Sequence, residues 1–238
     1  IDNSTFTSNE ANDKGGAIFI DESSGLNINN CHFSNLIAEV DGGAIYGRSN
    51  VIVKRSTFND TTANTGSGGA IYTSSGYVSV SNSTFINNTA DIDGGAIYSS
   101  SDSIRVIDSN FSYTTVVGWG SGGAIFGNAG VDIINSNFTN TQAGIWGGAI
   151  FGRNSISVSN STFTNNKANN GGSIYIGGDG NLIVSESIFN HIVANIDGGA
   201  IYGETGTNIN VSNSTFINAT ATEYGGAIYG EGSVSVAD

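Results

Sequence analysis

The tetrapeptide Gly-Gly-Ala-Ile recurs along the whole chain and constrains the fold more than any other feature. It begins at Gly15, Gly42, Gly68, Gly94, Gly122, Gly147, Gly198 and Gly225, and a ninth copy at Gly171 reads Gly-Gly-Ser-Ile. A second marker recurs with it, at Phe6, Phe33, Phe58, Phe85, Phe111, Phe138, Phe163, Phe189 and Phe216. Copies of each marker are 24 to 28 residues apart, so the two markers stay in register. This period indicates a solenoid, in which each repeat packs only against its neighbours.

Each repeat contains three short segments that look like strands. Seven and five residues before the Phe stand two aliphatic residues, and the residue between them is mostly polar. This is the period-two pattern of a strand with one buried face. Asn stands three residues before the Phe in six of the nine copies, and Asn tolerates the left-handed conformation of a tight corner. The complete aliphatic pairs are Leu26 and Ile28, Val51 and Val53, Val78 and Val80, Ile104 and Val106, Val131 and Ile133, Ile156 and Val158, Leu182 and Val184, and Ile209 and Val211.

A repeat of about 26 residues with three strands and three corners is too short to include a helix. Each strand must therefore pair in parallel with its equivalent one repeat away, about 4.8 Å along the axis. The predicted fold is all-β: a right-handed, single-stranded parallel β-helix of about nine coils of 24–28 residues, with three short strands per coil. The right hand follows from the general preference of parallel crossover connections.

The whole chain, residues 1–238, is expected to form one β-helix segment. Ile1 falls in an aliphatic strand position, and Val234 and Val236 occupy the aliphatic positions of a tenth coil. Solenoids usually end in polar capping coils. We therefore expect a segment that is uncapped at both ends and excised from a longer array.

The composition argues against several classes of partner. Asp and Glu outnumber Lys and Arg by 20 to 7, which gives a formal net charge of −13. Such a surface repels nucleic acid and anionic lipid headgroups, and no apolar run approaches the ~18 residues of a membrane span. We expect no nucleic acid partner and no membrane insertion by this segment. Cys31 stands where the other copies have Ser, so it is predicted to be a small core residue.

The sequence contains no convincing catalytic or metal-binding cluster. Parallel β-helices include pectin-cleaving enzymes, but the seven basic residues are scattered, and His32 and His191 lie six coils apart, roughly 29 Å. We predict no catalytic residues and no cofactor. Asp41, Asp91, Asp93 and Asp197 precede Gly-Gly pairs without forming a stack, so solvated corner carboxylates are favoured over weak calcium binding.

An aromatic residue follows each Gly-Gly-Ala/Ser-Ile segment and is the candidate binding feature. If each Ile points inward, strand alternation turns the aromatic ring outward. Tyr is more frequent here than in the Phe column, which suggests that the ring edges reach water. Two interpretations stay open: stacking that stabilises the ladder, and an exposed platform for glycan rings or a partner surface. The column contains Phe19, Tyr46, Tyr72, Tyr98, Phe126, Phe151, Tyr175, Tyr202 and Tyr229.

Asn-x-Ser/Thr sequons are a second surface feature. Several lie in the Asn-Ser-Thr corner, where the fold already favours these residue types, so glycosylation is an additional possibility for an exported protein. The candidates are Asn3, Asn59, Asn82, Asn87, Asn110, Asn137, Asn160, Asn210, Asn213 and Asn218. An ice-binding face would need two aligned Thr columns, which only the first and seventh copies of the Phe segment have.

The paired Gly-Gly-Ala-Ile and Phe-x-x-Asn motifs resemble the repeats of chlamydial polymorphic outer membrane proteins. They are also similar to repeats in adhesin-like surface proteins of methanogenic archaea. Phe-x-x-Asn occurs at Phe6 to Asn9, Phe85 to Asn88 and Phe163 to Asn166, so an external Asn ladder would be incomplete. The resemblance implies an extracellular, cell-surface location and an adhesive role.

The leading hypothesis is a non-catalytic extracellular adhesin or stalk that mediates attachment or projects a binding region. Its expected partners are a host or neighbouring-cell surface, through glycan or protein, and possibly copies of itself. The alternative is a structural subunit of an extracellular filament or sheath. A glycan-active β-helix enzyme is the least favoured reading.

Overall fold

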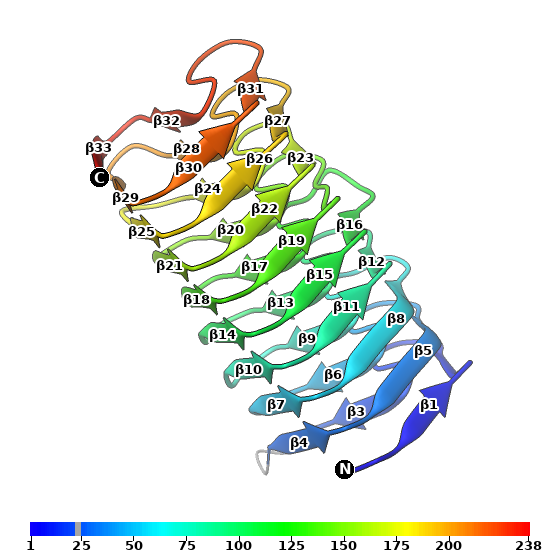
Figure 1. Cartoon of the computed structure of the whole chain (residues 1–238). Helices are drawn as coiled ribbons and strands as arrows, with labels where there is room; N and C mark the ends of the chain where they lie inside the picture. The colour runs from blue at the N-terminus through cyan, green and yellow to red at the C-terminus, as the bar shows by residue number, and fades with distance from the viewer. Residues whose placement is uncertain (22–24) are drawn as a thin grey trace.

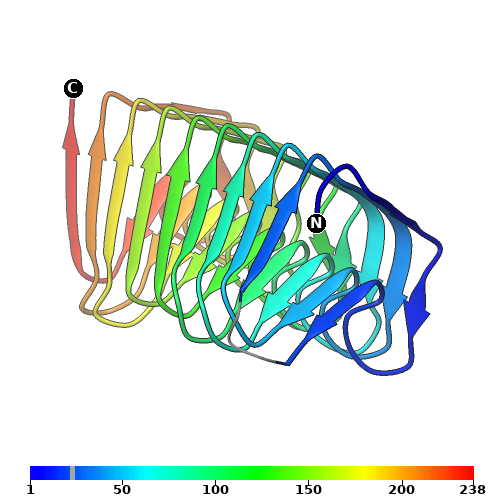
Figure 2. The same cartoon turned by 90° about the horizontal axis from the view of Figure 1, so that it is seen from below.

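The computed structural model describes residues 1–21 and 25–238. All regular secondary structure within these residues is β-strand. The strands stack into an elongated rod whose two termini lie at opposite ends (Figure 1). In the view from below, equivalent strands of successive coils lie side by side along the axis of the rod (Figure 2). The predicted right-handed parallel β-helix of about nine coils is confirmed.

Three sheets run the length of the rod, and each contains one strand from nearly every coil. The aliphatic sheet, which contains the aliphatic pairs, consists of β4 (Leu26–Asn29), β7 (Val51–Lys54), β10 (Val78–Ser81), β14 (Ile104–Ile107), β18 (Gly130–Ile134), β21 (Ser155–Ser159), β25 (Asn181–Ser185), β29 (Asn208–Ser212) and β33 (Ser233–Ala237). The Phe sheet consists of β1 (Thr5–Thr7), β5 (His32–Ala38), β8 (Thr57–Ala63), β11 (Thr84–Ile86), β15 (Asn110–Ser112), β19 (Asn137–Thr139), β22 (Thr162–Thr164), β26 (Ile188–Asn190) and β30 (Thr215–Ile217).

The Ile sheet contains the residues that follow Gly-Gly, and short corner strands either extend the Phe sheet or form a separate three-stranded sheet. The Ile sheet consists of β3 (Ile18–Ile20), β6 (Ile45–Gly47), β9 (Ile71–Thr73), β13 (Ile97–Ser99), β17 (Ile125–Gly127), β20 (Ile150–Gly152), β24 (Ile174–Ile176), β28 (Ile201–Gly203) and β32 (Ile228–Gly230). The corner strands of the Phe sheet are β2 (Glu10–Ala11), β12 (Thr89–Ala90) and β16 (Thr115–Val116), and the separate sheet consists of β23 (Lys167–Ala168), β27 (Val193–Ala194) and β31 (Thr220–Ala221).

Equivalent residues of successive coils are paired, so identical side chains stack on one another. Phe85 pairs with Phe58 and Phe111, and the neighbouring rings are stacked at centroid distances of 4.8 and 4.7 Å. Seven of these Phe side chains are at most 1% exposed; Phe6 and Phe216, in the first and last coils, are partly buried. The Phe column is therefore the centre of the core, as predicted.

The Ser two residues before each Phe does more than fill space. Ser109 Oγ donates a hydrogen bond to the Ile107 carbonyl at 2.8 Å and accepts one from the Ser83 backbone N–H at 3.1 Å. The same pair of bonds recurs from Ser56 to Ser187, and these serines are buried. The ladder satisfies backbone groups inside the corner. Cys31, buried and without a disulfide partner, occupies this column as predicted.

Three left-handed residues turn the chain in each coil. The residue three before each Phe and the residue two after it have positive φ. Around Phe85, for example, φ is 49° at Asn82 and 53° at Asn87. The first glycine of Gly-Gly is the third corner: at Gly68 φ is 68°, and an added Cβ would lie 2.4 Å from the Ile71 carbonyl oxygen. An added Cβ on Gly69 would lie 2.1 Å from the Gly95 carbonyl oxygen, so close coil stacking also requires the second glycine.

Two of the three asparagines of Phe-x-x-Asn, Asn88 and Asn166, lie inside the rod, so the expected external Asn ladder is wrong there; Asn9, in the first coil, is exposed. Asn88 is fully buried and donates to Thr61 Oγ1 at 2.8 Å; Asn166 is 1% exposed and accepts the Thr141 N–H at 3.0 Å. The left-handed residue just before this position interrupts the strand, so the inward–outward alternation of side chains shifts by one residue. The side chain therefore points inward, as Leu36 does in the equivalent position of an earlier coil.

Replacing Phe111 by Ala tests the Phe column. The substitution removes a fully packed ring between Phe85 and Phe138, and we expect the free energy of unfolding to fall by about 3–5 kcal/mol, through lost burial and the remaining cavity. Denaturant titration measures this. Trp119→Ala, at a side chain that is 85% exposed, is the control and should change stability by less than about 0.5 kcal/mol. Equal effects would contradict the assignment of Phe111 to the core.

Replacing Ser109 by Ala tests the serine ladder. The variant leaves the buried Ser83 N–H without its acceptor, so we expect a loss of about 1–3 kcal/mol in the free energy of unfolding. Ser79→Ala removes an outward-facing hydroxyl and should be close to neutral. Hydrogen exchange should locate the defect, because the Ser83 amide should lose protection more than amides three coils away. Unchanged protection at Ser83 would show that the ladder contributes no stability.

Candidate functional site

The aromatic residue after each Gly-Gly-Ala/Ser-Ile segment lies on the outer side of the Ile sheet. Ile71, Ile97 and Ile201 are fully buried in the main core, as the predicted inward facing requires. The outward rings form a second cluster of their own, which includes Phe126, Phe151, Tyr175 and Tyr202. This column is named the outer ring column below, and consists of Phe19, Tyr46, Tyr72, Tyr98, Phe126, Phe151, Tyr175, Tyr202 and Tyr229.

The prediction that the outer ring column is an exposed stripe is wrong for most of its length. Tyr72, Tyr98 and Tyr229 are half-buried, and only Phe19 is as much as 50% exposed. Neighbouring rings are separated by centroid distances of 4.5–5.4 Å, so each ring covers the face of the next. Adjacent side chains cover the rest; the Lys14 ammonium, for example, lies 4.6 Å from the Tyr46 ring centroid. The buried members are Tyr46, Phe126, Phe151, Tyr175 and Tyr202.

Two tyrosine hydroxyls of the outer ring column, those of Tyr175 and Tyr202, contact carboxylates of the next coil. Tyr175 Oη donates to Glu204 Oε1 and Tyr202 Oη donates to Glu231 Oε1, each at 2.5 Å. Burial, together with the adjacent Glu204 carboxylate, raises the pKa of Tyr175 above its ordinary value. The pKa of Tyr202 is also raised, mainly by burial and further by the Glu231 carboxylate. Both rings therefore stay neutral hydrogen-bond donors, and the preference for Tyr has a cause in the fold as well as in contact with water.

The carboxylates before Gly-Gly bind backbone amides. Asp41 Oδ1 accepts the Ser67 N–H at 3.1 Å, and Asp93 Oδ1 accepts the Ser121 N–H at 2.8 Å. Asp197 Oδ1 accepts the Tyr224 N–H at 2.9 Å, so the same contact joins the next coil there. Across residues 1–21 and 25–238, no three His, Cys, Asp or Glu side chains are grouped closely enough to hold a metal ion. These three aspartates are corner residues, but they are partly buried and hydrogen-bonded to backbone amides rather than solvated as expected.

The sequon asparagines lie on the surface. Asn59 is half-buried, and the other candidates, Asn3, Asn82, Asn87, Asn110, Asn137, Asn160, Asn210, Asn213 and Asn218, are exposed. Six of the ten have positive φ and form corners, so the fold alone favours Asn at those positions. Accessibility permits modification, and glycosylation stays a prediction.

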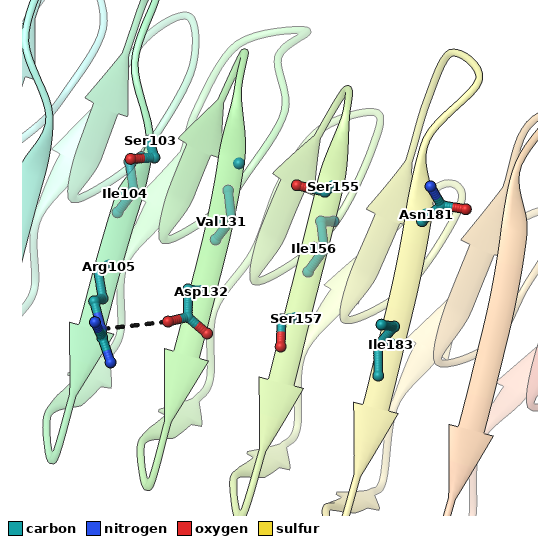
Figure 3. A pocket seen from close by; sticks show the side chains of 11 residues that line it. Ser103, Ile104, Arg105, Val131, Asp132, Ser155, Ile156, Ser157, Asn181 and Ile183 are labelled. Carbon is teal, nitrogen blue, oxygen red and sulfur yellow. Dashed lines mark ion pairs between the residues drawn. The ribbon is translucent and has the colours of Figure 1, made fainter.

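The outer face of the aliphatic sheet has a shallow groove across β14, β18, β21 and β25 (Figure 3). The groove forms where Gly130 and Ser155 have small side chains, and Ile183, which is 52% exposed, lines it. Arg105 and Asp132 form an ion pair at 3.3 Å between Nε and Oδ2. The only carboxylate lining the groove is therefore neutralised by its neighbour, an arrangement suited to contact rather than to acid–base chemistry.

The chain belongs to the family described as the right-handed β-helix region, which matches residues 1–149. Residues 160–177 match the repeat of the Chlamydia polymorphic membrane protein, which confirms the resemblance to chlamydial repeats. No curated protein and no solved structure matches the chain. Among the described residues, no helix has the length and apolar character needed to cross a membrane.

Replacing Asp93 by Asn tests the buried corner carboxylate. Burial raises the pKa of Asp93, and the Ser121 N–H opposes this only in part. A raised folded-state pKa means that the stability contributed by the group is present below the unfolded pKa and is lost as the pH rises through the folded pKa. Asn retains the acceptor without the charge, so the variant should have the larger free energy of unfolding at pH 7. That gain should disappear at about pH 3, where Asp93 is protonated.

The matched control is Asp41→Asn. Asp41 accepts an equivalent backbone N–H, but its carboxylate also pairs with Lys14 at 3.1 Å. Losing that ion pair should remove any gain at pH 7. Denaturant titrations of both variants at pH 3 and pH 7 provide the measurement, and an Asp93→Asn gain that is the same at both pH values would contradict the role of charge burial.

Proposed function

We propose that this chain is a non-catalytic part of an extracellular adhesin or stalk, displayed at a cell surface, and that its outer faces contact glycan or protein on another surface. The main supporting observation is that, in the aliphatic sheet, the inward columns are constant while the central outward column varies. In the aliphatic sheet, the inner residues of every strand are aliphatic. The central outward column instead reads Asn27, Ile52, Ser79, Arg105, Asp132, Ser157, Ile183, Asn210 and Ser235.

A solenoid with a constant core and variable outer columns is suited to recognition. The core fixes the backbone, so an outward residue can change without disturbing the coil. Neighbouring outward side chains are about 4.8 Å apart along the axis, which allows several coils to contact one extended partner. Enzyme sites need convergent titratable groups, and the ion-paired groove on the aliphatic sheet does not supply them.

The family comparisons support the surface role. The match of residues 160–177 to the Chlamydia polymorphic membrane protein repeat favours an outer-membrane or surface location. The acidic composition also favours protein or glycan partners over nucleic acid. A filament or sheath subunit would use the same rod, but it would contact copies of itself rather than a foreign surface.

An attachment assay separates these roles. Beads coated with the folded chain are presented to a panel of animal-cell and microbial surfaces, and retention under flow is measured. We expect retention that saturates with surface density and is competed by free chain. Beads coated with an unrelated protein of similar size and net charge control for electrostatics.

Two outcomes would contradict the proposal. Ordered fibres that form from the purified chain without surface attachment would favour the filament subunit. Release of new reducing ends from polygalacturonate, lost on substitution of a carboxylate, would show catalysis.

A further inference from the structure

The residue that follows each Ile-sheet strand forms a column of its own, and this column is interrupted once. The ladder continues one residue beyond the strand, as in the bonds from Arg153 N–H to the Gly127 carbonyl and from Gly177 N–H to the Gly152 carbonyl. The column reads Asp21, Arg48, Ser74, Ser100, Asn128, Arg153, Gly177, Glu204 and Glu231. Gly177 is the single position in this column without a side chain, and it leaves a gap beside Arg153, two coil rises from Glu204. The Glu204 carboxylate closes the other side of the gap, because an added Cβ on Gly177 would lie 3.1 Å from Glu204 Oε2.

The gap opens into a pocket of about 280 Å³, which is bounded by Trp146, Phe151, Arg153, Gly178 and Glu204 around Gly177. Trp146 comes from the position before Gly-Gly, and its indole stacks on Tyr175 at a centroid distance of 5.2 Å. The faces of Phe151 and Tyr175 are covered within the outer ring column, whereas Trp146 is half-buried. The indole also stacks on Phe151 at a centroid distance of 5.9 Å, so the part of it that faces away from these two rings supplies the exposed aromatic surface of the pocket.

Two charged side chains line the pocket: Glu204, which is held by hydrogen bonds, and Arg153, which is not in an ion pair of the described residues. Glu204 is fixed, because Oε1 accepts the Tyr175 hydroxyl and Oε2 accepts the Gly178 N–H at 2.8 Å. The Arg153 guanidinium lies 5.9 Å from the Phe151 ring centroid and is exposed. In the part of the chain that the structure describes, Arg153 belongs to none of the three ion pairs. Its donors are therefore available to a ligand.

We propose that this pocket binds one neutral hexopyranose unit of a glycan, an inference that rests on the adhesin function proposed above. A pyranose has an apolar face that packs on an indole, and hydroxyl groups that accept from a guanidinium and donate to a carboxylate. Trp146, Arg153 and Glu204 present these three contacts around a volume suited to a single small ligand. The fixed Glu204 carboxylate and the net charge of −13 select against acidic sugars.

Trp146 itself reports on binding. The chain has two Trp residues, and Trp119 is 85% exposed, so Trp119→Phe leaves Trp146 as the single indole without disturbing the core. In this background, methyl glucoside, methyl galactoside and methyl glucuronide are titrated while Trp emission is recorded. We expect a saturable change with at least one neutral glycoside, with a dissociation constant on the order of 1 mM. A response that is linear for every sugar, or tighter binding of the glucuronide, would overturn the proposal.

Three further variants identify the site. Arg153→Gln should weaken binding at least about tenfold, because it removes charge-assisted donors. Arg48→Gln is the matched control: it occupies the same column, next to Asp21, and should leave the titration unchanged. Gly177→Asn places in the gap the residue type found at Asn128 and should abolish binding while the chain stays folded, because the added Cβ would lie 3.1 Å from Glu204 Oε2 and displace that carboxylate. Unchanged binding in Arg153→Gln and Gly177→Asn would place the sugar elsewhere and overturn the pocket.

The attachment assay, repeated with Gly177→Asn beads, separates this inference from the proposed function. Saturable bead attachment by the parent chain, with no sugar response at Trp146, would overturn the pocket and leave the adhesin role standing. A saturable sugar response with no bead attachment to any surface would support the pocket while counting against the adhesin role. Loss of both sugar binding and attachment in Gly177→Asn supports the two together.

Discussion

The in-register pairing of each coil with the next is the constraint on which the rest of the structure depends. It places every residue directly above its equivalent, so each column must be able to stack on itself. Phe rings satisfy this with flat stacking, and serines with a chain of hydrogen bonds. Like charges in one column repel, which explains why only 11% of the residues are charged. Opposite signs meet in the pairs Lys14–Asp41 and Arg105–Asp132. Glu204 and Glu231 are an exception: they are adjacent in one column, and each accepts a tyrosine hydroxyl of the preceding coil.

The corners are the second constraint, because a coil of 24–28 residues must reverse direction without losing its backbone bonds. Left-handed residues turn the chain, and side-chain oxygens then accept the amides that the turn leaves unpaired, as Ser109 Oγ does for Ser83 and Asp93 does for Ser121. Asn, Ser, Asp and Gly are abundant for this reason. A composition that could suggest disorder is, in this chain, the chemistry of closely spaced corners.

The sequence predicts the core of this fold well and its surface poorly, for a physical reason. Period-two alternation correctly predicts inward Ile71 and outward Tyr72, because strand geometry alone decides facing. The exposure of Tyr175 could not be read in this way, because it depends on a neighbouring ring and on Glu204, 29 residues away. Asn88 was misplaced because the left-handed Asn87 resets the alternation. The direction in which a side chain points is set by the local strand geometry, whereas its solvent exposure depends on the side chains of neighbouring coils.

This distinction also indicates where function can arise in such a rod. A residue of the same type as its equivalents in other coils is explained by stacking, so it indicates little about a binding partner. Trp146 and Gly177 depart from their columns: one adds an indole where other coils mostly have small or charged residues, and the other removes a side chain. The two departures lie in neighbouring coils on the same face and bound one pocket. Both departures also have contacts within the rod, because the indole stacks on Phe151 and Tyr175 and the bare Gly177 makes room for the Glu204 carboxylate. The proposed sugar would use the indole surface and the gap that these contacts leave open.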